Sequence, residues 1–231
     1  MGFSYSPKVV TDGLVLYLDA ANPLSYANGS TKWNDLSRGR NNGTLVNGPS
    51  FQDNAIVFDG ANEYIDLGTP LSIGQLDEIT ISTWVYIDAF SPGADAFLST
   101  DGSPRGWYLG TWNHPNTGNT NIVRWLVSTD GSTTDALNTS ELSRYQWYYL
   151  TGTWNSSTMQ IFVDGELNTS ISTANTTTPL PDPSNSLRMG VRYSLTQFFN
   201  GKIAQAKIYN RALSAQEVQR NYQALKSRFS L

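Results

Sequence analysis

Short apolar runs separated by turn residues recur along almost the whole chain. Each run is bounded by Gly, Asn, Asp, Ser or Pro, and this pattern favours β-strands joined by turns over long amphipathic helices. The sequence therefore predicts an all-β protein. The predicted strands are Leu14–Asp19, Ala55–Asp59, Tyr64–Leu67, Ile79–Asp88, Gly106–Thr111, Ile122–Ser128, Trp147–Asn155, Met159–Val163 and Gly201–Tyr209.

Alternation within these runs predicts strands with two different faces. Successive side chains of a strand point to opposite sides of the sheet, so the run Ile79–Asp88 divides into two sets. We expect the aliphatic set to face a core and the polar-aromatic set to face away from it. The first set is Ile79, Ile81, Val85 and Ile87, and the second is Thr80, Ser82, Trp84 and Tyr86.

One hairpin and one helix are specified locally. Residues 159–167 predict a hairpin in which Asp164 and Gly165 supply the positive φ angles of a primed turn. Near the C-terminus, Ser214 and Glu217 have the spacing of a capping box, which predicts the start of a helix. An apolar stripe at helical spacing follows and predicts that this helix packs on the sheets; its members are Val218, Tyr222, Leu225 and Phe229.

The domain organisation expected from these patterns is simple. The length suits one β-sandwich, and no internal stretch has the composition of a domain linker. The sequence predicts a sandwich over residues 13–213 and a helix over residues 214–231 packed on the same domain. Residues 1–12 precede the first predicted strand, and we expect them to form an arm that docks on another protein or a second copy of this chain.

Composition and charge exclude several classes of protein. The chain has 231 residues and no cysteine, which rules out a disulfide scaffold and thiolate metal sites. It carries 15 Lys and Arg against 19 Asp and Glu, and this acidic balance predicts no nucleic-acid partner. The first residues do not have the pattern of a secretory signal, and no apolar run has bilayer length. We therefore expect synthesis in the cytoplasm and no membrane partner.

Four ordered stretches together resemble the laminin-G-like, concanavalin A-like jelly-roll family. The resemblance implies an all-β, two-sheet antiparallel jelly-roll sandwich with one C-terminal helix. Members bind carbohydrate, protein or calcium at rim loops or on a sheet face, and some related sandwiches hydrolyse glycans. The stretches are Gly13–Ala20, Trp33–Ser37 with Asn41–Leu45, Ile56–Gly60 with Glu63–Ile65, and Phe199–Ile203 with Ile208–Ser214.

The opening of the chain carries a narrower resemblance. Residues 6–14 and 19–23 are similar to stand-alone members among structural proteins of tailed bacteriophages, especially those of marine cyanobacteria. This implies a non-enzymatic decoration protein on the virion surface, in which residues 1–12 contact other virion proteins. Host-surface glycan is implied as a second partner. A homo-oligomer fits the same setting. The alternatives are a free carbohydrate-binding adhesion module and, third, a glycan hydrolase.

Catalytic patterns are weak in this sequence. Glycan-cleaving relatives place acids at alternating positions of one strand, but the only acidic pair with that spacing, Asp164 and Glu166, straddles the hairpin glycine. The single histidine, His114, falls in a predicted polar loop rather than beside a nucleophile. The sequence therefore predicts a protein that is not an enzyme, and no required cofactor.

Structural calcium is the metal that the resemblance leaves open. Relatives often carry an acid in the turn after the strand that ends at Asp59, and here Asn62 and Glu63 could join Asp59 as oxygen ligands. Relatives also carry acids in the last strand, where this chain has Ala204 and Gln205, which weakens the inference. In the alternative interpretation Asp59 caps the turn.

A set of aromatic and polar residues is the candidate carbohydrate site. Aromatic rings stack on the apolar face of a sugar while Asn, His or Arg bonds its hydroxyls. The alternative is that these tryptophans fill the core, which alternation favours for Trp107, whereas Trp112 begins a predicted loop. The candidate residues are Trp112, Asn113, His114, Arg124 and Trp125.

Overall fold

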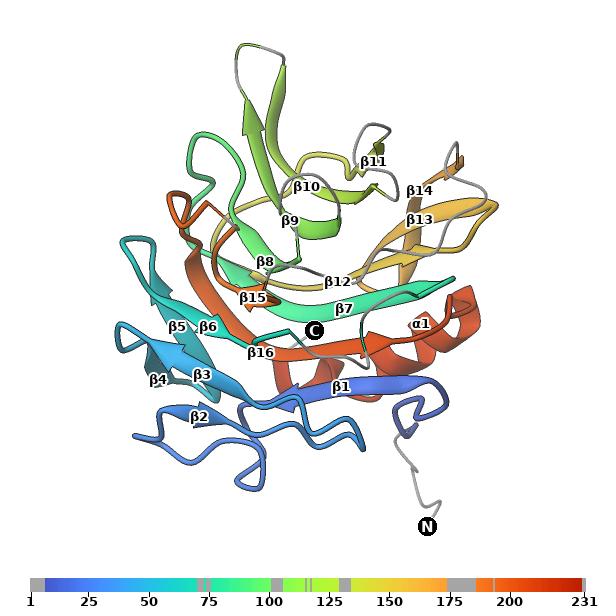
Figure 1. Ribbon diagram of the computed structural model, residues 1–231. Helices are drawn as coiled ribbons and strands as arrows, with labels where there is room; N and C mark the ends of the chain where they lie inside the picture. Colours follow the sequence, from blue (N-terminus) through green and yellow to red (C-terminus); the bar gives the residue numbers. More distant parts are fainter. Residues whose placement is uncertain are drawn as a thin grey trace.

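Two antiparallel β-sheets packed face to face form the body of the protein (Figure 1). The computed structural model describes residues 7–69, 73, 76–100, 106–114, 116, 118–128, 134–173, 186–192 and 194–229. Within those residues each sheet contains eight strands, and every pairing between strands is antiparallel. The predicted jelly-roll sandwich is confirmed.

The first sheet has β7 and β16 near its middle. Its strand order is β14 (Glu166–Ser172), β13 (Thr158–Val163), β12 (Trp147–Trp154), β7 (Ile79–Ile87), β16 (Asn200–Tyr209), β5 (Ala55–Asp59) and β4 (Ser50–Gln52), and β1 (Leu14–Asp19) also pairs with β16. Strands from both ends of the chain therefore lie side by side, which joins the termini to one sheet.

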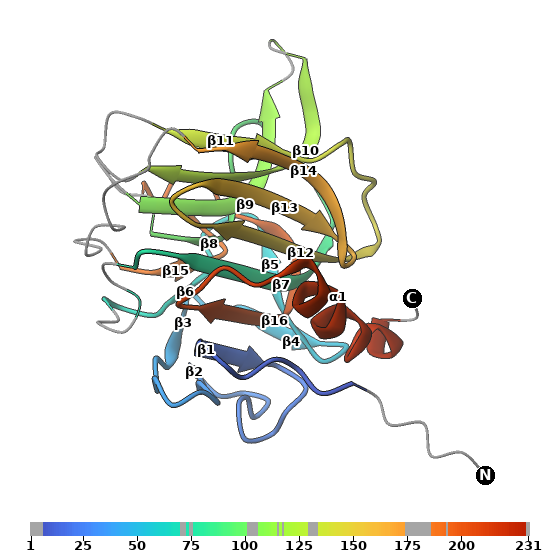
Figure 2. The same ribbon diagram turned by 90° about the vertical axis from the view of Figure 1, so that its right-hand side faces the viewer.

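The second sheet carries the shorter strands of the fold at one edge. Its order is β11 (Asp135–Asn138), β10 (Asn119–Ser128), β9 (Gly106–His114), β8 (Ala96–Ser99), β15 (Arg188–Met189), β6 (Tyr64–Asp66), β3 (Gly43–Val46) and β2 (Lys32–Trp33). The β9–β10 hairpin projects beyond the body of the sandwich in both views (Figures 1 and 2).

The main core lies between the two sheets and follows the predicted alternation. Ile81 and Val85 of β7 belong to this core, whereas Trp84 belongs to a separate apolar cluster on the other face of the first sheet. Trp107 and Trp125 of the second sheet are buried here, with their ring centroids 6.5 Å apart. Large aromatic side chains thus fill the space between the two sheets and contribute much of the buried apolar area.

The C-terminal helix covers the outer face of the first sheet (Figure 2). Helix α1 (Ala215–Gln223) begins at the predicted capping box, in which Ser214 and Glu217 bond each other's backbone N–H groups. A 3₁₀ turn, η3 (Lys226–Phe229), continues the apolar stripe. Val218 is fully buried against the sheet, which confirms the predicted packing.

The predicted N-terminal arm is shorter than expected. Val10 is buried, its N–H donates to Oδ1 of Asn221 at 2.7 Å, and its carbonyl accepts from the Tyr209 hydroxyl at 3.0 Å. The carbonyl of Lys8 accepts from Arg220 Nε at 2.7 Å. Residues 8–12 therefore belong to the folded domain, because helix α1 supplies partners that the sequence pattern does not reveal. Residues 1–6 of the predicted arm lie outside the described residues.

Among the helices that the structure describes, none combines the length and the apolar character needed to span a bilayer.

The predicted hairpin is confirmed, because Asp164 and Gly165 have φ angles of 52° and 82° between β13 and β14.

Gly152 provides a test of the packing between the sheets. A Cβ atom at Gly152 would lie 2.6 Å from Cδ2 of Trp125, so the Gly152→Ala substitution forces the indole or the strand to move. We expect a loss of about 1–3 kcal/mol in the free energy of unfolding, measured by denaturant titration. Trp125→Phe should make the added methyl less costly, so the two substitutions together should be non-additive. Equal stability of Gly152→Ala and wild type would contradict this packing.

Asp95 gives a second test, based on pH. Its side chain is 1% exposed just before β8, and burial raises its pKa from 3.8 to about 6, although Ser91 and Thr111 partly oppose the shift. A raised pKa favours the folded state below 3.8 and loses that contribution as the pH rises to about 6. Asp95→Asn should therefore be more stable than wild type by about 3 kcal/mol above pH 6, and this gain should vanish near pH 4. Thermal unfolding of both proteins across this pH range measures the stability difference. A difference that does not change with pH would show that Asp95 does not titrate in this way.

Candidate functional site

The candidate site lies at the base of the β9–β10 hairpin, where the chain leaves β11. Residues 139–145 run from β11 toward β12 and pass close to the start of β10. The N–H of Thr139 donates to the carbonyl of Val123 at 2.9 Å, and the N–H of Leu142 donates to the carbonyl of Asn121 at 2.8 Å. This segment is therefore held against β10 by backbone hydrogen bonds.

Further bonds fix the other end of the segment. The N–H of Tyr145 donates to the carbonyl of Ile87 at 2.8 Å, and the N–H of Ser143 donates to the Tyr148 hydroxyl at 2.9 Å. That hydroxyl donates back to the carbonyl of Ser143 at 3.2 Å. A loop held in this way presents its side chains from a rigid scaffold, as binding loops commonly do.

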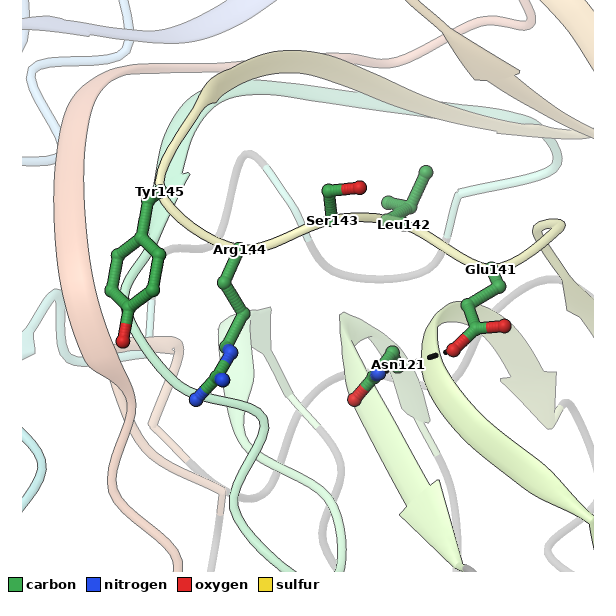
Figure 3. Close-up of a pocket in the computed structure, with 6 residues that line it drawn as sticks. All are labelled: Asn121, Glu141, Leu142, Ser143, Arg144 and Tyr145. Atoms are coloured by element: carbon green, nitrogen blue, oxygen red, sulfur yellow. Dashed lines mark hydrogen bonds between the residues drawn. The ribbon is translucent and has the colours of Figure 1, made fainter.

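A pocket of about 460 Å³ lies along this segment, and Figure 3 shows the side chains around it. Arg144 and Tyr145 lie on one side of the backbone and Leu142 on the other. Nδ2 of Asn121 donates to Oε1 of Glu141 at 3.1 Å, which orients both polar groups. The lining residues are Asn121, Glu141, Leu142, Ser143, Arg144 and Tyr145.

Tyr145 is the unusual residue of the pocket. Its side chain is 61% exposed and its φ angle is 65°, a conformation that bulky residues seldom adopt. Asn121 also has a positive φ, 53°, at the irregularity between β9 and β10. Strained backbone that persists in a well-bonded loop is a recognised feature of ligand sites. The Arg144 guanidinium lies over one face of this ring, with its Cζ 5.2 Å from the Tyr145 ring centroid. The arrangement can stack a sugar ring on the other face of Tyr145 and bond hydroxyls through amide, carboxylate and guanidinium groups.

Three of the sequence-predicted binding residues form one cluster on the outer face of the second sheet, and none of the five lines the pocket. The Cζ atom of Arg124 lies 3.7 Å from the centroid of the Trp112 ring, and the His114 ring centroid lies 4.2 Å from it. Nε of Arg124 donates to Oδ1 of Asn138 at 2.8 Å. Trp112 and Arg124, both half-buried on the outer face of the second sheet, thus stack on each other.

The other predicted residues have structural roles. Trp125 has no exposed surface, and its Nε1 donates to the carbonyl of Thr153 at 3.1 Å, so its prediction as a binding residue is wrong. Asn113 donates from Nδ2 to the carbonyl of Phe90 at 2.8 Å and exchanges backbone bonds with Gly93. Trp112 to His114 also continue strand β9 instead of forming a loop, because His114 pairs with Asn119.

Positive charge gathers on this face of the second sheet. Arg192 lies over the ring of Tyr108, with Cζ 5.4 Å from its centroid. Burial lowers the pKa of Arg124, and the charge of Arg192 acts in the same direction. Tyr108 opposes this shift. The surface therefore suits an anionic or strongly hydrogen-bonding ligand.

The residues predicted for calcium lie in one turn, and one oxygen of each already accepts a hydrogen bond. Oδ1 of Asp59 accepts from the N–H of Ala61 at 2.8 Å, and Oε2 of Glu63 accepts from the N–H of Asp59 at 2.8 Å. The carbonyl of Asn62 accepts from Asn47. Burial and the Asp59 carboxylate raise the pKa of Glu63, so the two acids repel.

Calcium needs six to eight oxygen ligands, and in the described parts of the chain no three acidic or histidine side chains converge on one point. Asp59 does cap the turn, as the alternative interpretation expects, and structural calcium at this turn stays a prediction.

The acidic pair considered for catalysis is separated by its partners. Oδ1 of Asp164 accepts from the N–H of Tyr149 at 2.8 Å on the first sheet, whereas Oε1 of Glu166 accepts from Gln219 of helix α1 at 3.2 Å. The two carboxylates thus serve the attachment of hairpin and helix.

Sequence reasoning missed Asn121, Glu141 and Tyr145; the available signal was an aromatic residue within the polar run 143–146.

Comparison with known proteins identifies the family. The protein-family model of the concanavalin A-like lectin/glucanases superfamily, in its laminin G type, matches residues 59–219 of the sequence. No curated protein matches the chain in sequence.

Several solved structures are similar in fold. The binding domain of botulinum neurotoxin serotype D has a TM-score of 0.69 at 17% identity, covering 93% of this chain and 51% of that chain. The serotype D ligand-binding domain in complex with N-acetylneuraminic acid has a TM-score of 0.68 at 17% identity, covering 93% and 51%. The binding domain of Paraclostridial Mosquitocidal Protein 1 has a TM-score of 0.65 at 20% identity, covering 91% and 52%.

The chain spans about half the length of these structures. Together with the family match over residues 59–219, the two packed sheets place this chain in the concanavalin A-like lectin/glucanases superfamily, to which it belongs as a jelly roll with a lectin-like binding fold.

Proposed function

We propose that this chain is a non-enzymatic carbohydrate-binding domain whose ligand occupies the pocket at residues 141–145. The observation that carries the proposal is Tyr145, a ring that is 61% exposed and held at a φ of 65° beside three kinds of polar group. Sugar recognition uses this combination of an exposed aromatic face and convergent hydrogen-bonding groups.

The position of Arg124 extends the proposal to the kind of glycan. Asn121 and Arg124 are three residues apart on β10, roughly 10 Å along a strand. The irregularity between Asn119 and Ile122 interrupts the alternation that would otherwise place these two side chains on opposite faces, and residues 138–141 run beside them. An oligosaccharide of a few units over the pocket would therefore reach the Arg124 guanidinium. An acidic sugar unit is the group that this charge would favour. The complex of the serotype D domain with N-acetylneuraminic acid is a precedent in the same fold.

A non-enzymatic role is supported by the separation of Asp164 and Glu166 and by the fold similarity to receptor- and ligand-binding domains.

We infer in addition that the domain is displayed on a virion surface, where it meets host glycan. This finer proposal rests on the resemblance of residues 6–23 to phage structural proteins. Because residues 8–12 are packed on the domain, docking to other virion proteins falls to residues 1–6.

The glycan proposal is tested by titration with neutral and acidic oligosaccharides. Tyr145→Ala should lower the affinity for every oligosaccharide that binds by at least roughly tenfold, because the stacking ring is lost, whereas Tyr145→Phe should retain binding. Arg124→Gln should lower the affinity for acidic oligosaccharides only, and that affinity should no longer depend on salt concentration.

Leu24→Ala is the matched control, since Leu24 is also an exposed large side chain, 76% exposed, outside the pocket. Unchanged affinity of Tyr145→Ala for a glycan that the wild type binds would refute the pocket as the site. Failure of the wild type to bind any glycan on an array would refute the carbohydrate function itself.

The virion proposal predicts that mass spectrometry detects this chain in purified particles of a phage that encodes it. Removing residues 1–6 should abolish incorporation while leaving the thermal unfolding temperature unchanged. Absence of the chain from particles, with glycan binding intact, would leave a free adhesion module instead.

A further inference from the structure

A fully buried lysine lies between the first sheet and the C-terminal segment. The side chain of Lys207 on β16 has no exposed surface, and its Nζ donates to Oε1 of Gln205. The same nitrogen lies 5.0 Å from the centroid of the Tyr17 ring. An ammonium group buried in this way is unfavourable unless a carboxylate compensates it.

The carboxylate that faces Lys207 is already engaged. Both oxygens of Asp19 accept from the Arg228 guanidinium, Oδ1 from Nη2 and Oδ2 from Nη1, each at 2.9 Å. Oδ2 also accepts from Gln205 Nε2 at 3.1 Å and from the Tyr17 hydroxyl at 3.2 Å. Asp19 thus serves a bidentate ion pair that attaches η3 to the sheet.

The groups around Lys207 come from every element packed against it. They comprise one acid, Asp19, one competing cation, Arg228, and side chains that are neutral near pH 7. Strand β1 contributes Tyr17 and Asp19, β7 contributes Ser82 opposite Lys207, β16 contributes Gln205, η3 contributes Arg228, and Tyr149 of β12 acts through Tyr17.

The charge balance depends on the protonation state of the amine. With Lys207 neutral, Asp19 and Arg228 compensate each other; with Lys207 charged, two cations share one carboxylate. Burial lowers the pKa of Lys207 from 10.5 to about 7, with Asp19 opposing the shift and Arg228 adding to it. The closed arrangement therefore favours the neutral amine.

The segment that carries Arg228 lies at the outside of the fold, whereas Lys207 is part of a central strand. Residues 226–229 follow the end of α1, and the family match already stops at residue 219. The Arg228 side chain is 29% exposed against 6% for Asp19. Phe229 stacks on Trp84 with a centroid distance of 4.0 Å, so release of the segment would uncover an aromatic surface.

We propose that residues 226–229 form a latch over the first sheet, closed while Lys207 is neutral and released when the protonated amine takes Asp19 from Arg228. In the released state Lys207 pairs with Asp19, Trp84 loses the Phe229 ring, and the outer face of the first sheet opens beside α1.

The direction of the pH effect follows from proton linkage. In the released state the ion pair with Asp19 favours the charged amine, so the pKa of Lys207 lies above the value of about 7 that it has in the closed state, and closing releases a proton. The latch gains stability as the pH rises from about 7 toward 10.5 and is weakest at pH 7 and below. The closing equilibrium should rise by up to roughly tenfold per pH unit in this window.

Hydrogen exchange of the intact protein, measured by mass spectrometry from pH 7 to 9.5, tests the latch. Exchange of peptides covering residues 222–231 is corrected with an unstructured peptide of the same sequence. Protection should increase with pH in the wild type, while peptides from β7 and β12 should show no such trend. Protection that stays constant across this range overturns the proposal.

Two variants and one control assign the effect. Lys207→Met keeps the length of the side chain without the amine, and its protection should be high and independent of pH. Lys202→Met removes a cation on the same strand, one paired with Asp53 at 2.9 Å, and should keep the wild-type trend. Persistence of the trend in Lys207→Met overturns the role of Lys207.

Arg228→Gln covers the case in which Lys207→Met does not fold. Loss of the ion pair should leave residues 222–231 poorly protected at every pH, while circular dichroism shows an intact sandwich. Wild-type protection in Arg228→Gln would show that the ion pair does not hold the segment closed.

Discussion

Strand β7 buries apolar side chains on both of its faces, and the placement of the other layers follows from this. Ile81 and Val85 contact the core between the sheets, and Trp84 is stacked with Tyr222 and Phe229 on the opposite side. Aromatic area of this size is costly to leave in water. The C-terminal helix must therefore act as a third layer, and the first sheet is sandwiched between the core and that helix.

This three-layer arrangement decides where a ligand can bind. With the outer face of the first sheet occupied, the outer face of the second sheet and the rim at the β9–β10 hairpin remain for recognition. Arg124 belongs to the former and Tyr145 to the latter. Asn138 at the end of β11 accepts from Arg124, and Glu141 in the following segment accepts from Asn121. The proposed binding groups thus come from loops and strand ends that a rigid sandwich holds in place, as is usual in β-sandwich binding proteins.

Much of the fold was predictable because local patterns agreed with the tertiary structure. The alternation in β7, the Asp164-Gly165 turn and the Ser214 capping box each specify one local geometry, and each was confirmed. The short strands β2 and β15 gave no signal, because two residues carry no alternation and form only by pairing with neighbours. None of the five residues predicted for carbohydrate lines the pocket at residues 141–145; Arg124 and Trp112 contact each other on the second sheet, whereas Trp125 faces the core.

The sequence by itself determined which residues alternate, where the chain turns and how the helix begins, since these depend on neighbours within a few positions. Only the tertiary structure decided what Val10, Asp19 and Tyr145 do. Val10 finds Asn221, Asp19 finds Arg228, and the Tyr145 backbone is held by Ile87, in each case a partner distant in the chain. Such pairings depend on how the two sheets and the helix pack in three dimensions, and no local periodicity records that packing.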